Sequence, residues 1–181
     1  MFETKNPGIN KKIKSFSVLS TPEIKQKLDT AQDVFYNYLH QTSVEERSLW
    51  AKKIAADLNE HKQTYADLIT LEMGKPIKQA IAEIEKCAWL CEFFAEHAPG
   101  FLADKMIETS YQKSYVHYQP LGAVMGIMPW NFPFWQAFRF FIPAMLAGNA
   151  TLLKPAPNVP QCGMTIENIV EHATGKAGFF Q

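Results

Sequence analysis

The sequence predicts an α/β fold in which several helices precede one strand–helix–strand unit. The first hundred of the 181 residues carry apolar side chains at helical spacing. Two short apolar runs, "AVMGIM" at 123–128 and "ATLLK" at 150–154, are typical of buried strands, and a helical pattern from about 134 to 146 lies between them. A strand, a helix and a second strand at this spacing form a βαβ unit, which implies a parallel sheet.

The helical region begins at a capping box, with Ser20 as the cap and Glu23 three residues later. Ser43 and Glu46 repeat this device before a second helical stretch, which continues to Gly74, a good C-terminal stop. Pro76 then begins the next helix. The side chains expected to pack inward are Ile24, Leu28, Ala31, Phe35, Leu39, Leu49, Ile54, Leu58, Leu68, Leu71, Ile77, Ile81, Ile84, Ala88, Cys91 and Ala95. Those expected to face solvent are Glu83, Glu85, Glu92 and Glu96.

Residues 108–119, "ETSYQKSYVHYQ", are rich in Tyr, Ser and Val without Gly or Pro, and therefore predict a strand. Both of its faces are partly polar, so we expect an edge strand or a projecting arm. The expected organisation is a helical part over 1–107, an arm strand over 108–120 and the βαβ unit over 121–181. A further helix is expected at about 161–172.

Charge and cysteine content restrict the class of partner. The 18 basic and 18 acidic residues give a formal net charge of zero, so the basic patch of a nucleic-acid-binding protein is not expected. Three cysteines without framework spacing argue against a disulfide-built secreted domain, and the first residues contain no apolar secretory segment. We expect a cytoplasmic protein whose partners are small molecules or other proteins, not nucleic acid.

Residues 121–153 are apolar enough to suggest a membrane helix in a hydropathy window. Pro129, Pro133 and Pro143 would interrupt such a helix, and side chains such as Arg139 and Asn149 are expensive to place in lipid. No membrane partner is therefore expected.

Polar motifs follow both predicted strands: "MPWN" ends the first and "KPAP" ends the second. Ligands bind beyond the carboxyl ends of parallel strands, so these motifs are expected to meet at one crevice if the strands are neighbours. Asn131 can there donate a hydrogen bond to a developing oxyanion, or it can satisfy a tight turn. Lys154 can bond the ribose hydroxyls or a phosphate of a nucleotide.

The stretch "GIMPWNFPFWQAFRFFIPAMLAGNATLLKPAPNVP" resembles the aldehyde dehydrogenase superfamily, and "EMGKP" at 72–76 and "PLGAV" at 120–124 fit the same resemblance. The likeness runs from about residue 21 to 171 and is greatest for the succinate-semialdehyde dehydrogenase branch. It implies the N-terminal helices and the first βαβ unit of a Rossmann-like NAD(P)-binding domain, with the rest of the fold incomplete in this chain.

The resemblance also implies roles for individual residues. Asn131 matches the catalytic asparagine that holds the thiohemiacetal oxyanion. The residues that match the cofactor-binding wall are Met128, Pro129, Trp130 and Asn131 on the nicotinamide side, and Lys154, Pro155, Ala156 and Pro157 on the adenosine-ribose side. Many NAD-preferring members carry a glutamate at the position of Pro157. A proline neither grips the ribose hydroxyls nor repels a 2′-phosphate, so NAD or NADP is expected, with a weak preference for NADP or dual use.

Arg139 follows Asn131 by eight residues and has apolar neighbours. It can be a helix arginine that extends to water, or it can bind a substrate carboxylate through its bidentate guanidinium. Semialdehyde-oxidising relatives carry an arginine at this spacing. The second interpretation predicts a substrate with an aldehyde at one end and a carboxylate at the other.

The resemblance further implies a cysteine nucleophile and a glutamate base that this chain is not expected to contain. Cys87 and Cys91 lie on an apolar helix stripe, Cys162 is expected in the helix after the second strand, and no metal site is expected. The chain alone is predicted to be inactive, whereas a full-length member would be a homo-oligomer. The alternative is a truncated, non-catalytic protein that interacts through strand addition at 108–119. Residues 171–181 match the family only loosely, which leaves a truncation or an excerpt open.

Overall fold

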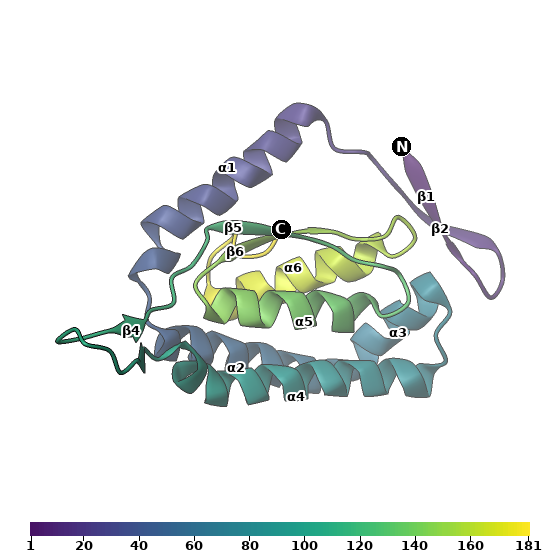
Figure 1. Ribbon diagram of the computed structural model, residues 1–181. Coiled ribbons are helices and arrows are strands. Elements are labelled where there is room, and N and C mark those ends of the chain that lie inside the picture. Colours follow the sequence, from purple (N-terminus) through teal and green to yellow (C-terminus); the bar gives the residue numbers. More distant parts are fainter.

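The computed structural model describes all 181 residues, and its helices lie in layers around a short parallel sheet (Figure 1). The helices are α1 (Thr21–Asn37), α2 (Val44–Glu60), α3 (Lys62–Met73), α4 (Ile77–Leu102), α5 (Pro133–Leu146) and α6 (Pro160–Thr174). The strands are β1 (Phe2–Asn6), β2 (Lys11–Phe16), β3 (Lys105–Met106), β4 (Tyr115–Val116), β5 (Ala123–Ile127) and β6 (Ala150–Lys154), and a 3-10 turn covers Leu39–Gln41.

The predicted βαβ unit is confirmed. Strands β5 and β6 pair in parallel with Ala123 opposite Ala150 and Ile127 opposite Lys154, and α5 connects them. Helices α5 and α6 lie on one side of this sheet and α1 lies on the other, while α2 and α4 form a further layer beneath α5 (Figure 1). Near the C-terminus, Phe180 forms a parallel bridge with Thr151, so the chain returns along the free edge of β6.

One continuous apolar core joins the helices to the sheet. Its largest fully buried side chains include Phe134, Phe138 and Phe141 of α5 and Phe179 near the C-terminus. Asn149 is also buried, and its Oδ1 accepts hydrogen bonds from the amides of Leu121 and Gly122. This asparagine is satisfied by the fold, because it fixes the turn that enters β5.

The expected helix boundaries are confirmed at several positions. The Glu23 carboxylate accepts a hydrogen bond from the Ser20 amide at 2.7 Å, and the Ser43 hydroxyl accepts one from the Glu46 amide at 3.1 Å. Gly74 ends α3 in the left-handed conformation, with φ of 76°. The second helical stretch is divided, however, because α2 ends at Glu60 and α3 begins at Lys62.

Four expectations about burial were wrong. Ile24 and Leu28 of the first stripe are exposed, because the outer half of α1 extends past the sheet (Figure 1). Strand β5 is not buried on both faces: Gly126 approaches the ring of Phe140, but Met125 is 62% exposed and Ile127 is 69% exposed. No other element of this chain covers that part of the second face. The third error is Glu83, which was expected to face solvent but is only 3% exposed. The fourth concerns Leu49 and Leu71, which were expected to pack inward but are 58% and 38% exposed.

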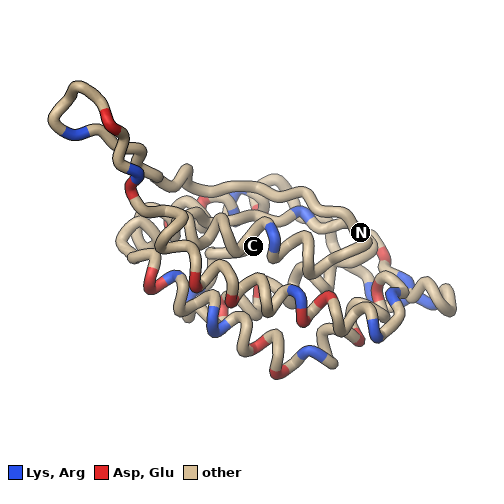
Figure 2. The backbone as a smooth tube through the Cα atoms, turned by 60° about the horizontal axis from the view of Figure 1, so that its bottom comes forward, with Lys and Arg blue, Asp and Glu red and all other residues tan.

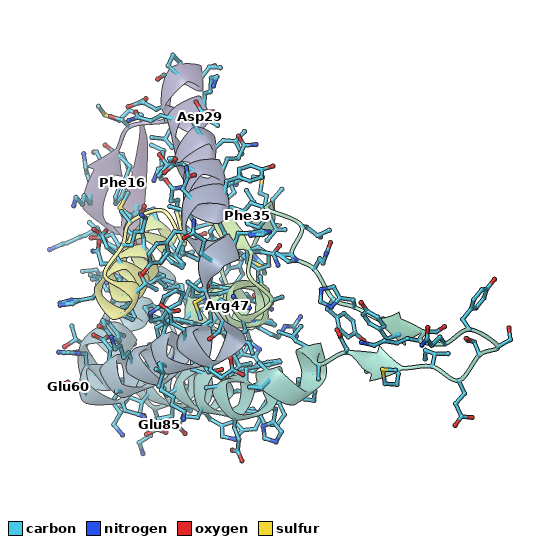
Figure 3. The ribbon with its side chains drawn as sticks, turned by 90° about the vertical axis from the view of Figure 1, so that its left-hand side faces the viewer. Phe16, Asp29, Phe35, Arg47, Glu60 and Glu85 are labelled. Carbon is cyan, nitrogen blue, oxygen red and sulfur yellow. The ribbon has the colours of Figure 1, made fainter.

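The predicted arm projects, but it is a hairpin and not one long strand. Only Tyr115 and Val116 of the predicted range form a strand, β4, which pairs antiparallel with β3 at Lys105–Met106. The intervening residues 107–114 form the tip, which extends away from the body of the molecule (Figure 3). β3 and β4 form a sheet of two strands only, and an isolated two-stranded hairpin gains little stability in water, which agrees with the short ladder.

Charged residues of both signs are distributed along the helices (Figure 2). Strands β1 and β2 pair as an antiparallel hairpin at the N-terminus, whose charged residues are mostly lysines. None of the helices combines the length and the apolar character that crossing a membrane requires.

Candidate functional site at the ends of β5 and β6

The two polar motifs lie side by side at the carboxyl end of the sheet. Ile127 is paired with Lys154, and the amide of Met128 donates a hydrogen bond to the carbonyl oxygen of Lys154 at 3.2 Å. The turn after β5, residues 129–132, and the turn after β6, residues 155–159, therefore begin at neighbouring points. The expectation that these motifs meet at one edge is confirmed.

Asn131 lies in the first turn with its side chain exposed, and it makes no hydrogen bond to the rest of the chain. An asparagine that stabilised its own turn would bond to a nearby backbone group, so this interpretation lacks support here. Trp130 beside it is 50% exposed and Met128 is partly buried. The amide of Asn131 is consequently free to donate to a ligand oxygen.

The second turn presents one cation beside an apolar wall. Lys154 is exposed, and its Nζ lies 3.3 Å from the carbonyl oxygen of Pro155 without an ion-pair partner. Pro155 packs against Gly163 of α6, where a Cβ would lie 3.2 Å from the proline ring. Pro155 and Ala156 are partly buried and Pro157 is exposed. A free ammonium beside a proline surface suits the hydroxyls and the apolar face of a nucleoside.

Arg139 lies on α5 two turns after the start of the helix, and its side chain is exposed without an ion-pair partner. Trp135, one turn earlier on the same face, is covered by Lys86 of α4, whose Nζ lies 4.1 Å from the ring centroid. Lys86 is also exposed and makes no ion pair. Two uncompensated cations therefore flank Trp135.

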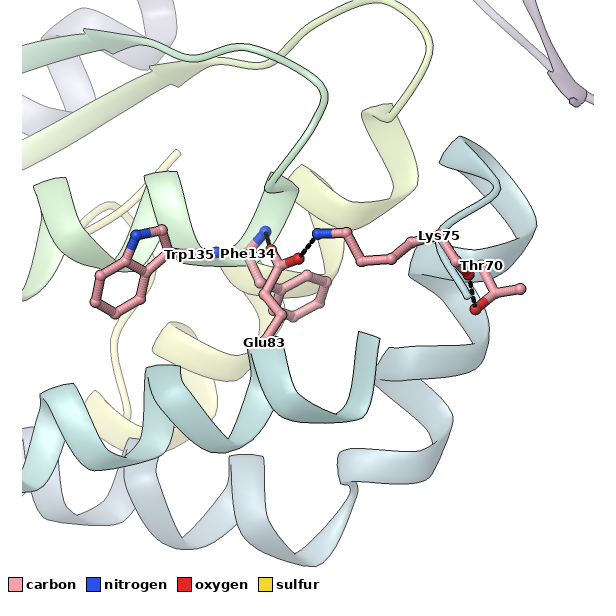
Figure 4. Close-up of polar contacts among 5 residues, drawn as sticks. All are labelled: Thr70, Lys75, Glu83, Phe134 and Trp135. Atoms are coloured by element: carbon pink, nitrogen blue, oxygen red, sulfur yellow. Dashed lines mark hydrogen bonds and ion pairs between the residues drawn. The ribbon is translucent and has the colours of Figure 1, made fainter. Parts of the chain in front are cut away.

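The buried polar contacts of this region involve residues that the sequence did not identify as part of the site. Glu83 of α4 points up to the start of α5, where its Oε1 accepts hydrogen bonds from the amides of Phe134 and Trp135, each at 3.0 Å (Figure 4). Its Oε2 forms a buried ion pair with Lys75, and the ammonium of Lys75 lies 3.7 Å from the ring centroid of Phe132. We call Lys75 and Glu83 the clamp.

A second buried carboxylate serves α6 in the same way. Glu72, at 1% exposure, accepts hydrogen bonds from the amides of Gln161 and Cys162 at 3.1 and 2.9 Å, and from the side-chain amide of Gln161. The amino ends of both helices are thus already occupied by an anion. Neither end can serve as the anion-binding terminus that a diphosphate would use.

The segment "EMGKP" at 72–76 organises these contacts. Glu72 caps α6, Gly74 turns the chain, Lys75 pairs with Glu83 and Pro76 precedes α4. A signal for Glu83 was present in the sequence, because it lies three residues after Ala80 and four before Cys87, both buried on the same helix face. A glutamate on such a stripe needs a buried partner.

The three cysteines are buried, as the sequence predicts for two of them and allows for Cys162. Burial raises the pKa of each thiol, and the neighbouring Glu72 carboxylate raises the pKa of Cys162 further. Thiols that stay protonated are poor nucleophiles. No group of three or more His, Cys, Asp or Glu side chains comes together as a metal site.

Comparison with known proteins agrees with this geometry. The model of the "Aldehyde dehydrogenase family" matches residues 1–181. A Synechocystis sp. protein named "Probable succinate-semialdehyde dehydrogenase (NADP(+))" is 46% identical over 178 residues, covering 98% of this chain and 39% of that protein. A Mycobacterium avium succinate-semialdehyde dehydrogenase (NADP(+)) is 38% identical over 181 residues, with 98% and 38% coverage.

Among solved structures, the succinic semialdehyde dehydrogenase of Streptococcus pyogenes in complex with NADP+ superposes with a TM-score of 0.95 at 28% identity. The match covers 99% of this chain and 40% of that one, so the chain spans about two fifths of the length of its relatives. The α/β fold, the meeting of the two motifs and the match over the whole chain agree: the chain belongs to the aldehyde dehydrogenase family.

Proposed function

We propose that this chain forms the oxyanion-holding and nucleotide-holding part of a dehydrogenase that oxidises succinate semialdehyde to its acid with NADP or NAD. The observation that carries the proposal is the meeting of two turns at one sheet edge, each with a free polar side chain. Asn131 and Lys154 are both exposed, and the Met128 amide bonded to the Lys154 carbonyl joins their turns.

In this proposal each side chain performs one task. The amide of Asn131 donates to the oxygen that becomes negatively charged when a thiolate attacks the aldehyde carbon. Lys154 donates to the ribose hydroxyls of the cofactor, while Pro155, Ala156 and Pro157 line the adenosine side and Met128, Pro129 and Trp130 the nicotinamide side. A bound nicotinamide cofactor supplies the acceptor for the hydride. The three buried cysteines of this chain supply no thiolate, so the chain alone is proposed to be inactive.

The substrate class follows from the cations on α4 and α5. We place the substrate carboxylate against Arg139, whose planar guanidinium can hold both oxygens, with Lys86 adding a second positive charge beside Trp135. Neither cation has an acidic partner in the fold, so a ligand carboxylate displaces no ion pair when it binds. The names of the Synechocystis and Mycobacterium relatives support a semialdehyde with this carboxylate.

The test uses a chimera of the Synechocystis relative in which residues 1–181 of this chain replace the matching segment. We call this protein the chimera. The unaltered chimera is expected to oxidise succinate semialdehyde with NADP. Arg139→Leu should raise the KM for succinate semialdehyde by about tenfold to a hundredfold, as loss of a charged hydrogen-bonded pair does, and leave the KM for butanal unchanged. Lys86→Met is expected to have a smaller effect of the same kind. Unchanged discrimination between the two aldehydes in Arg139→Leu would refute the carboxylate site.

The β3–β4 hairpin supports a second part of the proposal, which concerns partners. The hairpin projects from the body (Figure 3). Its exposed apolar side chains include Met106, Ile107, Tyr111 and Tyr115. We propose that it pairs by strand addition with another subunit of a homo-oligomer. Native mass spectrometry of the chimera, with and without residues 107–114 replaced by a short Gly-Ser turn, tests this. An unchanged subunit number would contradict it.

A further inference from the structure

We infer that Lys75 and Glu83 are positioning residues for Asn131: the clamp fixes the turn that carries the oxyanion donor. The catalytic meaning of this inference rests on the proposed function, but its structural content does not. The clamp residues touch neither motif directly and act through Phe132 and the first amides of α5.

The first step is that the turn has little structure of its own. Residues 129–131 make no hydrogen bond to any other part of the chain. The turn is attached upstream by the Met128 amide, which bonds to Lys154. At its downstream end it depends on Phe132 and on the helix that follows.

The second step is that the clamp holds this downstream end at two points. Glu83 accepts from the amides of Phe134 and Trp135, and no side chain of the turn caps α5 in its place. Lys75 lies over the ring of Phe132, the residue directly after Asn131. The two clamp side chains are 6% and 1% exposed, so water does not weaken these charge-assisted contacts.

The third step is that the clamp itself is rigid. Lys75 follows Gly74, whose φ of 76° suits glycine, and the hydroxyl of Thr70 donates to the Lys75 carbonyl at 2.8 Å (Figure 4). Glu83 lies well inside the 26-residue helix α4. A donor held from such elements is already placed when charge develops on the substrate, and a misplacement of about 1 Å can reduce a rate a hundredfold.

The structural test compares Glu83→Gln with the matched control Glu72→Gln in the 181-residue chain. Glutamine keeps the shape and an acceptor oxygen but removes the charge. In Glu83→Gln, the amides of Phe134 and Trp135 are expected to exchange with solvent about tenfold faster, as a neutral acceptor binds more weakly. The NMR order parameters of Trp130 and Asn131 are expected to fall. In Glu72→Gln, the faster exchange should appear at Gln161 and Cys162 instead.

Glu83→Gln leaves the buried ammonium of Lys75 unpaired and can therefore unfold the chain. The double variant Lys75→Met/Glu83→Gln removes both charges and is expected to stay folded while the turn still loosens. Unchanged order parameters at Trp130 and Asn131 in whichever of these variants is folded would overturn the positioning role.

The catalytic test measures the same variants in the chimera. Glu83→Gln and the double variant are expected to lower kcat about tenfold to a hundredfold with the KM for NADP unchanged, whereas Lys75→Arg, which keeps the charge opposite Glu83, should retain most of kcat. If the clamp had only a structural role, these variants would lower Tm without lowering kcat at an unchanged KM for NADP. That result would refute the catalytic part of the inference. An inactive unaltered chimera would refute the proposed function, and the NMR result would then decide the positioning role alone.

Discussion

The turns after β5 and β6 are built on one plan but are held differently. At each turn, a buried glutamate from an earlier helix accepts hydrogen bonds from the first amides of the helix that follows the turn. Glu83 does this for α5, and Glu72 does it for α6. Glu83 also pairs with Lys75, which covers Phe132, whereas Glu72 makes no ion pair. The additional cation is found at the turn that carries Asn131, the side chain that the proposed function places next to the reacting carbon.

This difference teaches how one short segment can support two neighbouring turns. Glu72 and Lys75 lie on either side of Gly74, so the same turn of the chain supports both the turn after β6 and the turn after β5. A change at 72–76 is therefore expected to affect both turns, whereas a change at Glu83 should affect only the first.

The largest difference between the two turns is expected when each carboxylate is removed entirely. Glu83→Ala deprives two amides of their acceptor and leaves a buried ammonium unpaired, so it should lower the free energy of unfolding by about 3–5 kcal/mol. Glu72→Ala leaves donors without an acceptor but no unpaired charge, and should lower it by about 1–3 kcal/mol. Urea unfolding followed by circular dichroism measures both values. Equal losses would show that the ion pair adds nothing to the first turn.

An intermediate effect is expected from a double-mutant cycle within the clamp. The double variant Lys75→Met/Glu83→Gln should lose less free energy of unfolding than the sum of the losses in the two single variants. The difference, which is the coupling free energy, is expected to be about 1–3 kcal/mol. The cycle Lys75→Met/Glu72→Gln provides the control, because Glu72 does not contact Lys75 through an ion pair. Additive losses in the first cycle would mean that Glu83 acts only as a helix cap.

Much of the fold was predictable, because capping and periodicity are local properties of the chain. Ser20 with Glu23, Ser43 with Glu46 and Gly74 all mark helix ends that the structure contains. The parallel pairing also followed from the strand–helix–strand spacing. The arm was less predictable, since a composition suited to strands does not reveal that its hydrogen-bonding partner is only two residues long.

The place of Glu83 on a buried helix face is a local signal, but its contacts with α5 could not be recognised from local patterns, because the two segments are far apart in the chain. Glu83 meets residues more than fifty positions later, and among the glutamates of α4 only its burial distinguishes it from Glu85, Glu92 and Glu96. The exposure of Met125 and Ile127 was missed for a related reason. An apolar strand indicates that something should cover it, but it does not indicate whether this chain supplies the cover.

The smallest expected effect concerns Cys162, whose amide donates to Glu72 at the start of α6. Burial raises the pKa of its thiol above the ordinary value of 9.0, and the Glu72 carboxylate raises it further. Glu72→Gln should therefore lower the pKa of Cys162 without returning it to the ordinary value. The pH dependence of iodoacetamide labelling, resolved by peptide mass spectrometry, measures this change, with Cys91 as the internal control because Glu72 does not contribute to its shift.

The same thiol links pH to stability with a definite sign. Above about pH 9 the unfolded thiol loses its proton while the buried thiol keeps it, so the unfolded state binds fewer protons and the free energy of unfolding falls as pH rises. Cys162→Ala should remove its share of this fall, about 1 kcal/mol between pH 8.5 and 10. Urea unfolding at both pH values measures that share. A fall that is identical in Cys162→Ala would mean that the thiol ionises as readily in the folded chain, which would contradict its burial beneath the second turn.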